Sequence, residues 1–256
     1  MKRAAVIVLN YNMREAADKW VKTIKERVTY PHDLIVVDNG SDKLAPSQFT
    51  TLRTECNVRT TGGMRLCIEY ADMRGLTEYD ERPGYYWLLT TSTELAYCAV
   101  DPLQTLVEAM ESKPNAVSIA PAYDSTVLAW THQIYKWHGG KGLQQIPTIP
   151  FGLISSDFYH EIGGFDQRLT HSWGLEHDLA FIADRMGRTS WLHNDVRLKV
   201  NEYIGYTMGR MDMSRERREV EARAEMDKVL TEKYGAMWKW IQERKSYDGI
   251  IRCDGN

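Results

Sequence analysis

The sequence lacks any apolar run long enough to cross a membrane. Its first apolar stretch, residues 4–9, spans only six residues, whereas a membrane span needs about 20 and the core of a signal peptide about 7–15. Its four cysteines form no CxxC pair and no metal-binding spacing, which is typical of a reducing compartment. We therefore expect a soluble protein of the cytoplasm.

A strong excess of charge of either sign is also missing. With 32 Lys and Arg against 35 Asp and Glu, the formal net charge is −3 and the pI is about 6.2. The overall charge therefore does not favour nucleic acid or an anionic membrane as a partner, although a local basic face is compatible with these values. The 256 residues suffice to bury a large core. We expect one domain over residues 1–212 and a helical C-terminal extension over residues 213–256.

Two continuous apolar runs end in clusters of polar residues. They read AAVIVLNYN and DLIVVDNGSD, a pattern typical of buried parallel strands. The apolar stripe between them predicts a helix, with Asn12 as its cap and Glu15 at the capping-box position. Strand, helix and strand in this order predict an open α/β sheet whose ligand crevice lies beyond the carboxyl ends of the strands. Asn10, Asn12 and Asp38 would face that crevice.

The rest of the chain repeats the same two patterns. NVRTTGG predicts a short strand and a glycine turn before a helix, and YYWLLTT and AVSIAPA predict buried strands. Asp101 followed by proline marks a helix start. Residues 123–150 predict a long functional loop or an irregular hairpin. Two short strands around Trp191 and Leu198, and a terminal amphipathic helix or helix pair within residues 214–245, complete the prediction.

Four ordered segments carry a more specific signal. They are VIVLNYN with LIVVDNGSD; NVRTTGGMRLCIEYA; YYWLLTTSTEL; and GGFDQRL followed by WGLEHDLAFIADRMG. In this order they resemble the inverting nucleotide-sugar glycosyltransferases of the GT-A fold, above all family 2 with its rhamnosyl- and galactosyltransferase-like members. The likeness covers residues 4–200. It implies a Rossmann-like α/β/α sandwich with a mixed sheet, and a UDP- or dTDP-sugar as donor.

The resemblance also implies roles for individual residues. An acid near the position of Asp38 hydrogen-bonds the base of the donor nucleotide, although an Asx turn in DNGSD would also explain it. Asn10 and Asn12 would flank that base. Glu176 takes the position of the catalytic base and Asp178 that of a second acid, although both acids also favour a helix start. The acceptor side would be lined by Trp137, Trp173 and His177.

The metal-binding residues of the family are missing. Aligned on the shared Thr-Glu-Leu, Ser92 stands where the family has its metal-binding Asp, and a serine hydroxyl is a poor sole ligand for a divalent ion. VRLKVNEY likewise lacks a His that the family often places there. We expect either no metal, or Mn²⁺ or Mg²⁺ with Glu94 as a replacement ligand. Without a metal, cations such as Arg65 at a helix start, Lys199 and Arg210 would meet the diphosphate.

The sequence thus predicts a glycosyltransferase that moves a sugar from a nucleotide diphosphate to an acceptor hydroxyl and inverts the anomeric centre. Two alternatives stay open. A catalytically silent protein of the same fold would bind the nucleotide sugar without turnover. The acceptor could also be a hydroxymethylpyrimidine in modified DNA, as some phage enzymes use, which would make DNA a partner. A nucleotidyltransferase is disfavoured, because NYNMRE stands where such an enzyme has a glycine-rich loop.

Overall fold

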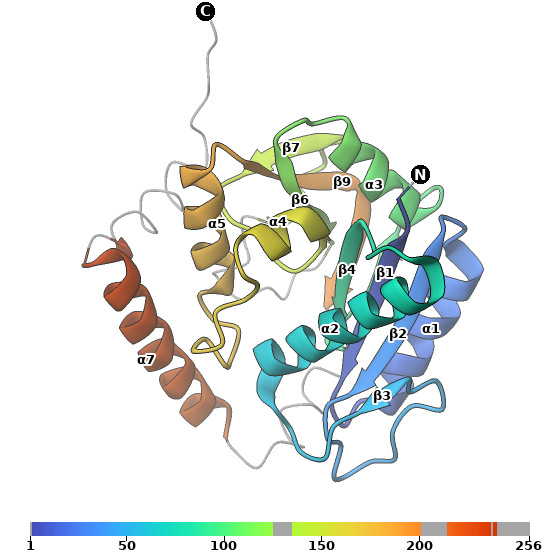
Figure 1. The fold of residues 1–256 in the computed structure, drawn as a ribbon, viewed down its shortest axis with the longest axis horizontal. Coiled ribbons are helices and arrows are strands. Elements are labelled where there is room, and N and C mark those ends of the chain that lie inside the picture. Colours follow the sequence, from blue (N-terminus) through green and yellow to red (C-terminus); the bar gives the residue numbers. More distant parts are fainter. Residues whose placement is uncertain (1, 125–134, 201–213, 237, 240–256) are drawn as a thin grey trace, which may run out of the picture.

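The computed structural model describes residues 2–124, 135–200, 214–236 and 238–239 (Figure 1). Its strands are β1 (Ala4–Asn10), β2 (His32–Asp38), β3 (Leu52–Arg53), β4 (Tyr85–Thr90), β5 (Thr93–Tyr97), β6 (Ala116–Tyr123), β7 (Leu143–Ile146), β8 (Leu153–Ser155) and β9 (Thr189–Val200). Its helices are α1 (Arg14–Arg27), α2 (Arg59–Tyr79), α3 (Pro102–Glu111), α4 (Ser156–Glu161), α5 (Leu175–Arg185) and α7 (Arg215–Tyr234).

The strands of the described residues form one mixed sheet in the order β3-β2-β1-β4-β8-β6-β9-β5, with β7 also paired to β9. Helices α1 and α3 cover one face, where Trp20 and Leu103 are buried against the strands. Helices α2, α4 and α5 cover the other face, with Ile68, Phe158 and Leu179 in its core. This arrangement confirms the predicted three-layer sandwich.

The carboxyl ends of β1, β2 and β4 lie at one edge of the sheet. Asn10 is in register with Asp38, and Leu9 with Thr90, in parallel pairs. Strand β5 starts at the same edge, because Thr93 pairs antiparallel with Val200 at the end of β9. The polar ends of these strands therefore meet at one edge of the sheet, as the order of strands and helices predicted.

The second helix differs from the prediction for NVRTTGG. No strand forms there: β3 lies earlier, and α2 begins at Arg59 and contains both glycines. A Cβ on Gly63 would lie 2.8 Å from Cδ1 of Leu9, so glycine lets this helix approach β1 closely. Gly63 therefore serves helix–strand packing, and the predicted turn was wrong.

Two further segments are more regular than predicted. Instead of two short strands, β9 is a single strand of 12 residues whose pairing with β6 shifts register between Pro121 and Ala122. Within residues 123–150, the described part includes β7, which pairs antiparallel with β9. Residues 125–134 lie outside the described part of the chain.

The start of α1 also corrects a prediction, whereas the start of α3 confirms one. Asn12 does not cap α1: the helix follows Met13, whose N–H donates to Oδ1 of Asn10 at 3.1 Å. The Asp101 side chain caps α3 as expected, because it accepts hydrogen bonds from the N–H groups of Leu103 and Gln104 at 2.9 and 3.0 Å.

Helix α7 is part of the main core and lies along the outside of the domain near α5 (Figure 1). Its residues Val229 and Leu230 are buried in the same cluster as Leu175 and Leu179 of α5. The contact is close at Gly174, which has a φ of 85° and whose missing Cβ would lie 2.7 Å from Cγ of Met226. None of the helices described has the length and apolar character that a membrane span needs.

Gly174→Ala is expected to lower the free energy of unfolding by about 2–4 kcal/mol, from a strained left-handed backbone together with the clash on Met226. Urea denaturation measures this loss. Gly187→Ala is the matched control, because Gly187 also has a positive φ, 66°, but open space around it; it should lose only about 1–2 kcal/mol. Equal losses in the two variants would show that the contact with α7 contributes nothing.

Candidate functional site

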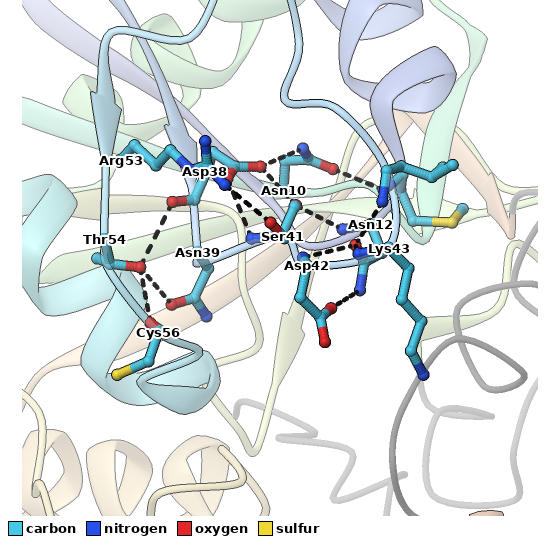
Figure 2. A network of polar contacts seen from close by, with 12 residues as sticks. Asn10, Asn12, Asp38, Asn39, Ser41, Asp42, Lys43, Arg53, Thr54 and Cys56 are labelled. Atoms are coloured by element: carbon cyan, nitrogen blue, oxygen red, sulfur yellow. Dashed lines mark hydrogen bonds and ion pairs between the residues drawn. The ribbon is translucent and has the colours of Figure 1, made fainter.

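The Asp38 carboxylate holds together the loop at the ends of β1 and β2 (Figure 2). It is fully buried. Its Oδ1 accepts from Nδ2 of Asn10 at 3.0 Å and from the hydroxyl of Ser41 at 2.5 Å, and its Oδ2 accepts from the N–H of Ser41 at 3.1 Å. Nε of Arg53 lies 3.3 Å from Oδ2. Asp38 and Asn10 therefore lie together, as predicted, and both carboxylate oxygens have partners within the protein.

Asn12 organises the adjacent loop. Its Oδ1 lies 3.2, 3.0 and 3.2 Å from the backbone nitrogens of Asp42, Lys43 and Leu44, and its Nδ2 donates to Asp42 at 2.8 Å. That amide is the main reason that the pKa of Asp42 is lowered. The residue adopts a φ of 55°, which asparagine tolerates better than most side chains. Asn12 thus fixes residues 42–44.

Asn39, which was not among the residues predicted from sequence, connects the end of β2 to the start of α2. Its Nδ2 donates to Oδ1 of Asn57 and to the carbonyl of Arg59, both at 3.1 Å, and its Oδ1 accepts from the N–H of Val58 at 3.1 Å. From sequence, Asn39 reads only as a turn residue in DNGSD. Its bonds depend on α2, which lies about 20 residues further along.

Arg65 is not at a helix start, contrary to the prediction. It lies in the second turn of α2, and its Nε donates to Glu69 at 2.6 Å. The hydrogen bond from Arg65 to Glu69 raises the pKa of the guanidinium. Arg59 occupies the first position of the helix instead. The predicted contact of Arg65 with a phosphate remains a prediction. Arg210 lies outside the described residues.

The turn between β4 and β5 ends in a cluster of three charged residues. Ser92 Oγ lies 2.8 Å from Oγ1 of Thr90. Glu94 is 7% exposed, and its carboxylate forms ion pairs with Lys199, at 2.7 Å, and with Lys19 of α1. Burial raises the pKa of Glu94, but the bonds from the two lysines outweigh it and the pKa is lowered. We call this cluster the lysine–glutamate triad.

These residues do not fit a divalent-ion site. Among the described residues, no three His, Cys, Asp or Glu side chains come together as a metal would require. Both oxygens of Glu94 are paired with lysine ammonium groups, and the hydroxyl of Ser92 lies against Thr90. A metal would have to displace two cations in order to use Glu94 as a ligand.

Glu176 lies in the first turn of α5, which follows Gly174. Its carbonyl accepts from the N–H of Ile149 at 3.1 Å, and this bond places it beside the segment that leads into β8. Its side chain is 28% exposed and lies 3.8 Å from Nε2 of His177. Tyr135 lies close by: burial first, and the charge of Glu176 second, raise its pKa. The carboxylate is thus accessible to a ligand and partly shielded from water.

Asp178, two residues further on, is in a different environment. It is 2% exposed, accepts a hydrogen bond from the hydroxyl of Tyr234 at 2.5 Å and lies 2.5 Å from Nζ of Lys233. The same lysine lies 3.2 Å from Asp166. The hydrogen bonds from Arg168 are the first reason that the pKa of Asp166 is lowered to about 2. Asp178 therefore ties α5 to α7.

The other residues predicted on the acceptor side are separated. Trp173 lies near α7, with the guanidinium carbon of Arg223 5.7 Å from its ring centroid. Trp137 packs on Arg197 of β9, whose guanidinium carbon lies 4.1 Å from both the Trp137 ring and the Tyr97 ring. Trp173 and His177 flank Glu176 in sequence, whereas Trp137 is placed beside β5 and β9.

Lys233→Met is expected to lower the free energy of unfolding by as much as about 3–5 kcal/mol, because it leaves the buried carboxylate of Asp178 without its cation. Chemical denaturation measures the loss. Lys228→Met, an exposed lysine on the same helix, is the control and should change stability by less than about 0.5 kcal/mol. A similar small effect at both positions would contradict the role of Asp178 as the tie to α7.

No protein-family profile and no curated protein matches the sequence. Solved structures do resemble the fold. GalNAc-T7, solved with UDP, GalNAc and Mn²⁺, matches with a TM-score of 0.56 and 13% identity over 78% of this chain and 44% of that one. The mannosyltransferase PcManGT from Pyrobaculum calidifontis, solved with GDP-Man and Mn²⁺, matches with a TM-score of 0.54 and 15% identity over 96% and 73% of the two chains.

S. aureus TarS also matches, with a TM-score of 0.54 and 10% identity over 90% of this chain and 44% of that one. The chain thus spans less than half of the length of GalNAc-T7 and of TarS. At these identities the likeness concerns the fold, and it agrees with the sheet order and helix layers described above. The chain has the GT-A fold of glycosyltransferases.

Proposed function

We propose that the protein is an inverting glycosyltransferase that moves a sugar from a nucleoside-diphosphate donor to an acceptor hydroxyl. The observation that carries this proposal is the position of Glu176. It is a partly exposed carboxylate in the first turn of α5, in a GT-A fold. Two proteins of similar fold were solved with UDP and GalNAc, and with GDP-Man, which supports a nucleotide-sugar donor.

In the proposed step, the acceptor oxygen attacks the anomeric carbon from the side opposite the diphosphate. The new C–O bond forms as the bond from the anomeric carbon to the phosphate oxygen breaks. The nucleoside diphosphate leaves with the bonding electron pair, and the acceptor proton passes to the Glu176 carboxylate. One direct displacement inverts the anomeric centre, and the proton transfer makes the attacking oxygen more nucleophilic.

The loops at the ends of β1 and β2 would form the nucleotide side of this site. Asn10, Asn12 and Asp38 are 1% exposed or less and bond to neighbouring groups. We therefore assign them to shaping the pocket for the base, with a UDP or dTDP donor favoured. The described residues around Glu94 do not fit a divalent ion, which supports the proposal of a reaction without a metal. The proposed acceptor group is a hydroxyl. Sugar transfer to duplex DNA that contains hydroxymethylpyrimidines would decide the alternative of a DNA acceptor.

Thermal unfolding with UDP-, dTDP-, GDP- and CDP-sugars, each in EDTA and in Mn²⁺, tests the donor. A ligand at 100 times its Kd adds about 2.7 kcal/mol of stability, or about 5–11 °C in Tm at this size. We expect one nucleotide to give this shift in EDTA. A shift that requires Mn²⁺ would refute metal independence, and the lack of any shift would refute the nucleotide-sugar donor.

Glu176→Gln is expected to lower the rate of transfer by about 10²–10⁴ because it removes the general base, while the Tm shift given by the donor stays the same. Glu15→Gln is the control, since Glu15 is also an exposed acid in the first turn of a helix; it should keep full activity. The readout is release of nucleoside diphosphate in the presence of a range of hydroxyl acceptors. Unchanged turnover in Glu176→Gln would overturn its role, and a wild-type protein that binds the donor without turnover would favour the silent binder.

A further inference from the structure

The turn between β4 and β5 leads into a carboxylate that two lysines already hold. GalNAc-T7 and PcManGT were solved with Mn²⁺, but the residues at this turn do not fit a divalent ion. We propose that Lys19 and Lys199, oriented by Glu94, form a fixed cationic site for the diphosphate of the donor in place of a divalent ion. This inference rests on the proposed function and names the groups that bind the leaving group.

The two cationic members of the triad are its exposed members. Two ammonium groups share one carboxylate. The negative member is the buried one: the side chain of Glu94 is 9% exposed, whereas those of Lys19 and Lys199 are 57% and 45% exposed. The ammonium-bearing side chains are therefore the members of the triad that an anionic ligand can reach from solvent.

Three separate elements fix the triad. Glu94 of β5 and Lys199 of β9 are directly paired residues of adjacent antiparallel strands, and Lys19 reaches them from α1. The lowered pKa of Glu94 agrees with a carboxylate that stays ionised. A charge held in place before the ligand arrives needs no rearrangement when the ligand binds, which makes it effective at stabilising an anion.

The triad also lies next to the edge of the sheet that carries the candidate nucleotide loops. Nε1 of Trp20, the residue after Lys19, donates to the carbonyl of Thr90 at 3.2 Å, and the hydroxyl of Thr93 donates to the same carbonyl at 3.1 Å. Thr90 ends β4, which pairs with β1, and β1 ends at Asn10. Helix α1, which follows Asn10 and Asn12 in the chain, thus places Lys19 beside the turn between β4 and β5.

Sequence reasoning found Lys199 but not Lys19, because an exposed lysine on a helix reads as a solvated residue. A purely structural role for the triad is the competing explanation: the ion pairs could do no more than tie β5 to α1. The two explanations predict different effects of each lysine on the affinity for a nucleotide that carries a second phosphate.

Calorimetric titration in EDTA separates these explanations. The probes are UDP and UMP, dTDP and dTMP, and GDP and GMP, with the pair chosen that binds the wild-type protein. Lys19→Met and Lys199→Met should each raise the Kd of the nucleoside diphosphate about tenfold, as expected for loss of a bond to a charged group. The Kd of the monophosphate should rise much less. Lys22→Met, an exposed lysine one turn along α1, should change neither. Equal losses for the two nucleotides, or no loss, would overturn the proposal.

Glu94→Gln supplies a second measurement that does not depend on removing a lysine. If the lysines bind the diphosphate, this change removes the carboxylate that competes for them, while the amide oxygen of Gln can still accept a hydrogen bond from an ammonium group and orient it. The diphosphate should then bind in EDTA as tightly as to the wild-type protein or more tightly. Weaker binding of the diphosphate in this variant would contradict the proposal. Lys19→Arg keeps the charge and should retain most of the affinity; a loss as large as in Lys19→Met would also contradict it.

Failure of this inference can be told apart from failure of the proposed function. If the wild-type protein binds a nucleoside diphosphate only when Mn²⁺ is added, the triad is not the cation site, but the proposed transferase stands. If no nucleoside diphosphate binds with or without Mn²⁺, both fail together. Binding in EDTA that depends on both lysines supports the two proposals at once.

Discussion

A buried carboxylate must be paired, and this constraint determines much of the structure around the candidate site. Asp38, Glu94 and Asp178 are 0%, 7% and 2% exposed, and an isolated charge at any of these positions would cost far more than a domain of this size can offset. Each one therefore recruits partners from other parts of the chain. The partners set the loop after β2, the turn after β4, and the contact between α5 and α7.

This constraint also separates the acids by role. Asp178 and Glu176 lie two residues apart on α5, yet Asp178 is enclosed by Tyr234 and Lys233, whereas the carboxylate of Glu176 is 28% exposed, with Nε2 of His177 at 3.8 Å. Only an accessible carboxylate can take a proton from a substrate. The contacts of Asp178 with Lys233 and Tyr234 hold α7 against the helix that carries Glu176.

The fold was predictable from sequence because its signals are local. The apolar runs of β1 and β2 mark buried strands, and Asp101 before a proline marks the start of α3; the structure confirms each of these. The wrong predictions concern residues whose type is compatible with two different structural roles. Asn12 is a good helix cap by type, but its side chain bonds to residues 42–44. Gly62 and Gly63 predicted a turn, but both lie within α2, and Gly63 lets the helix approach β1 closely.

The lysine–glutamate triad was harder to predict, because its members are about 75 and 105 residues apart in the chain and meet only once the sheet has formed. That Ser92 stands where the resemblance implies a metal-binding Asp can be inferred from sequence, but the contact of Lys19 with Glu94 cannot. With two ammonium groups bound to its oxygens, Glu94 is unsuited to share a divalent ion, since a nearby cation repels a second one. Even with an aspartate in place of Ser92, the two ammonium groups on Glu94 would repel a divalent ion near this turn. This arrangement supports the proposal that the lysines, and not a divalent ion, bind the diphosphate.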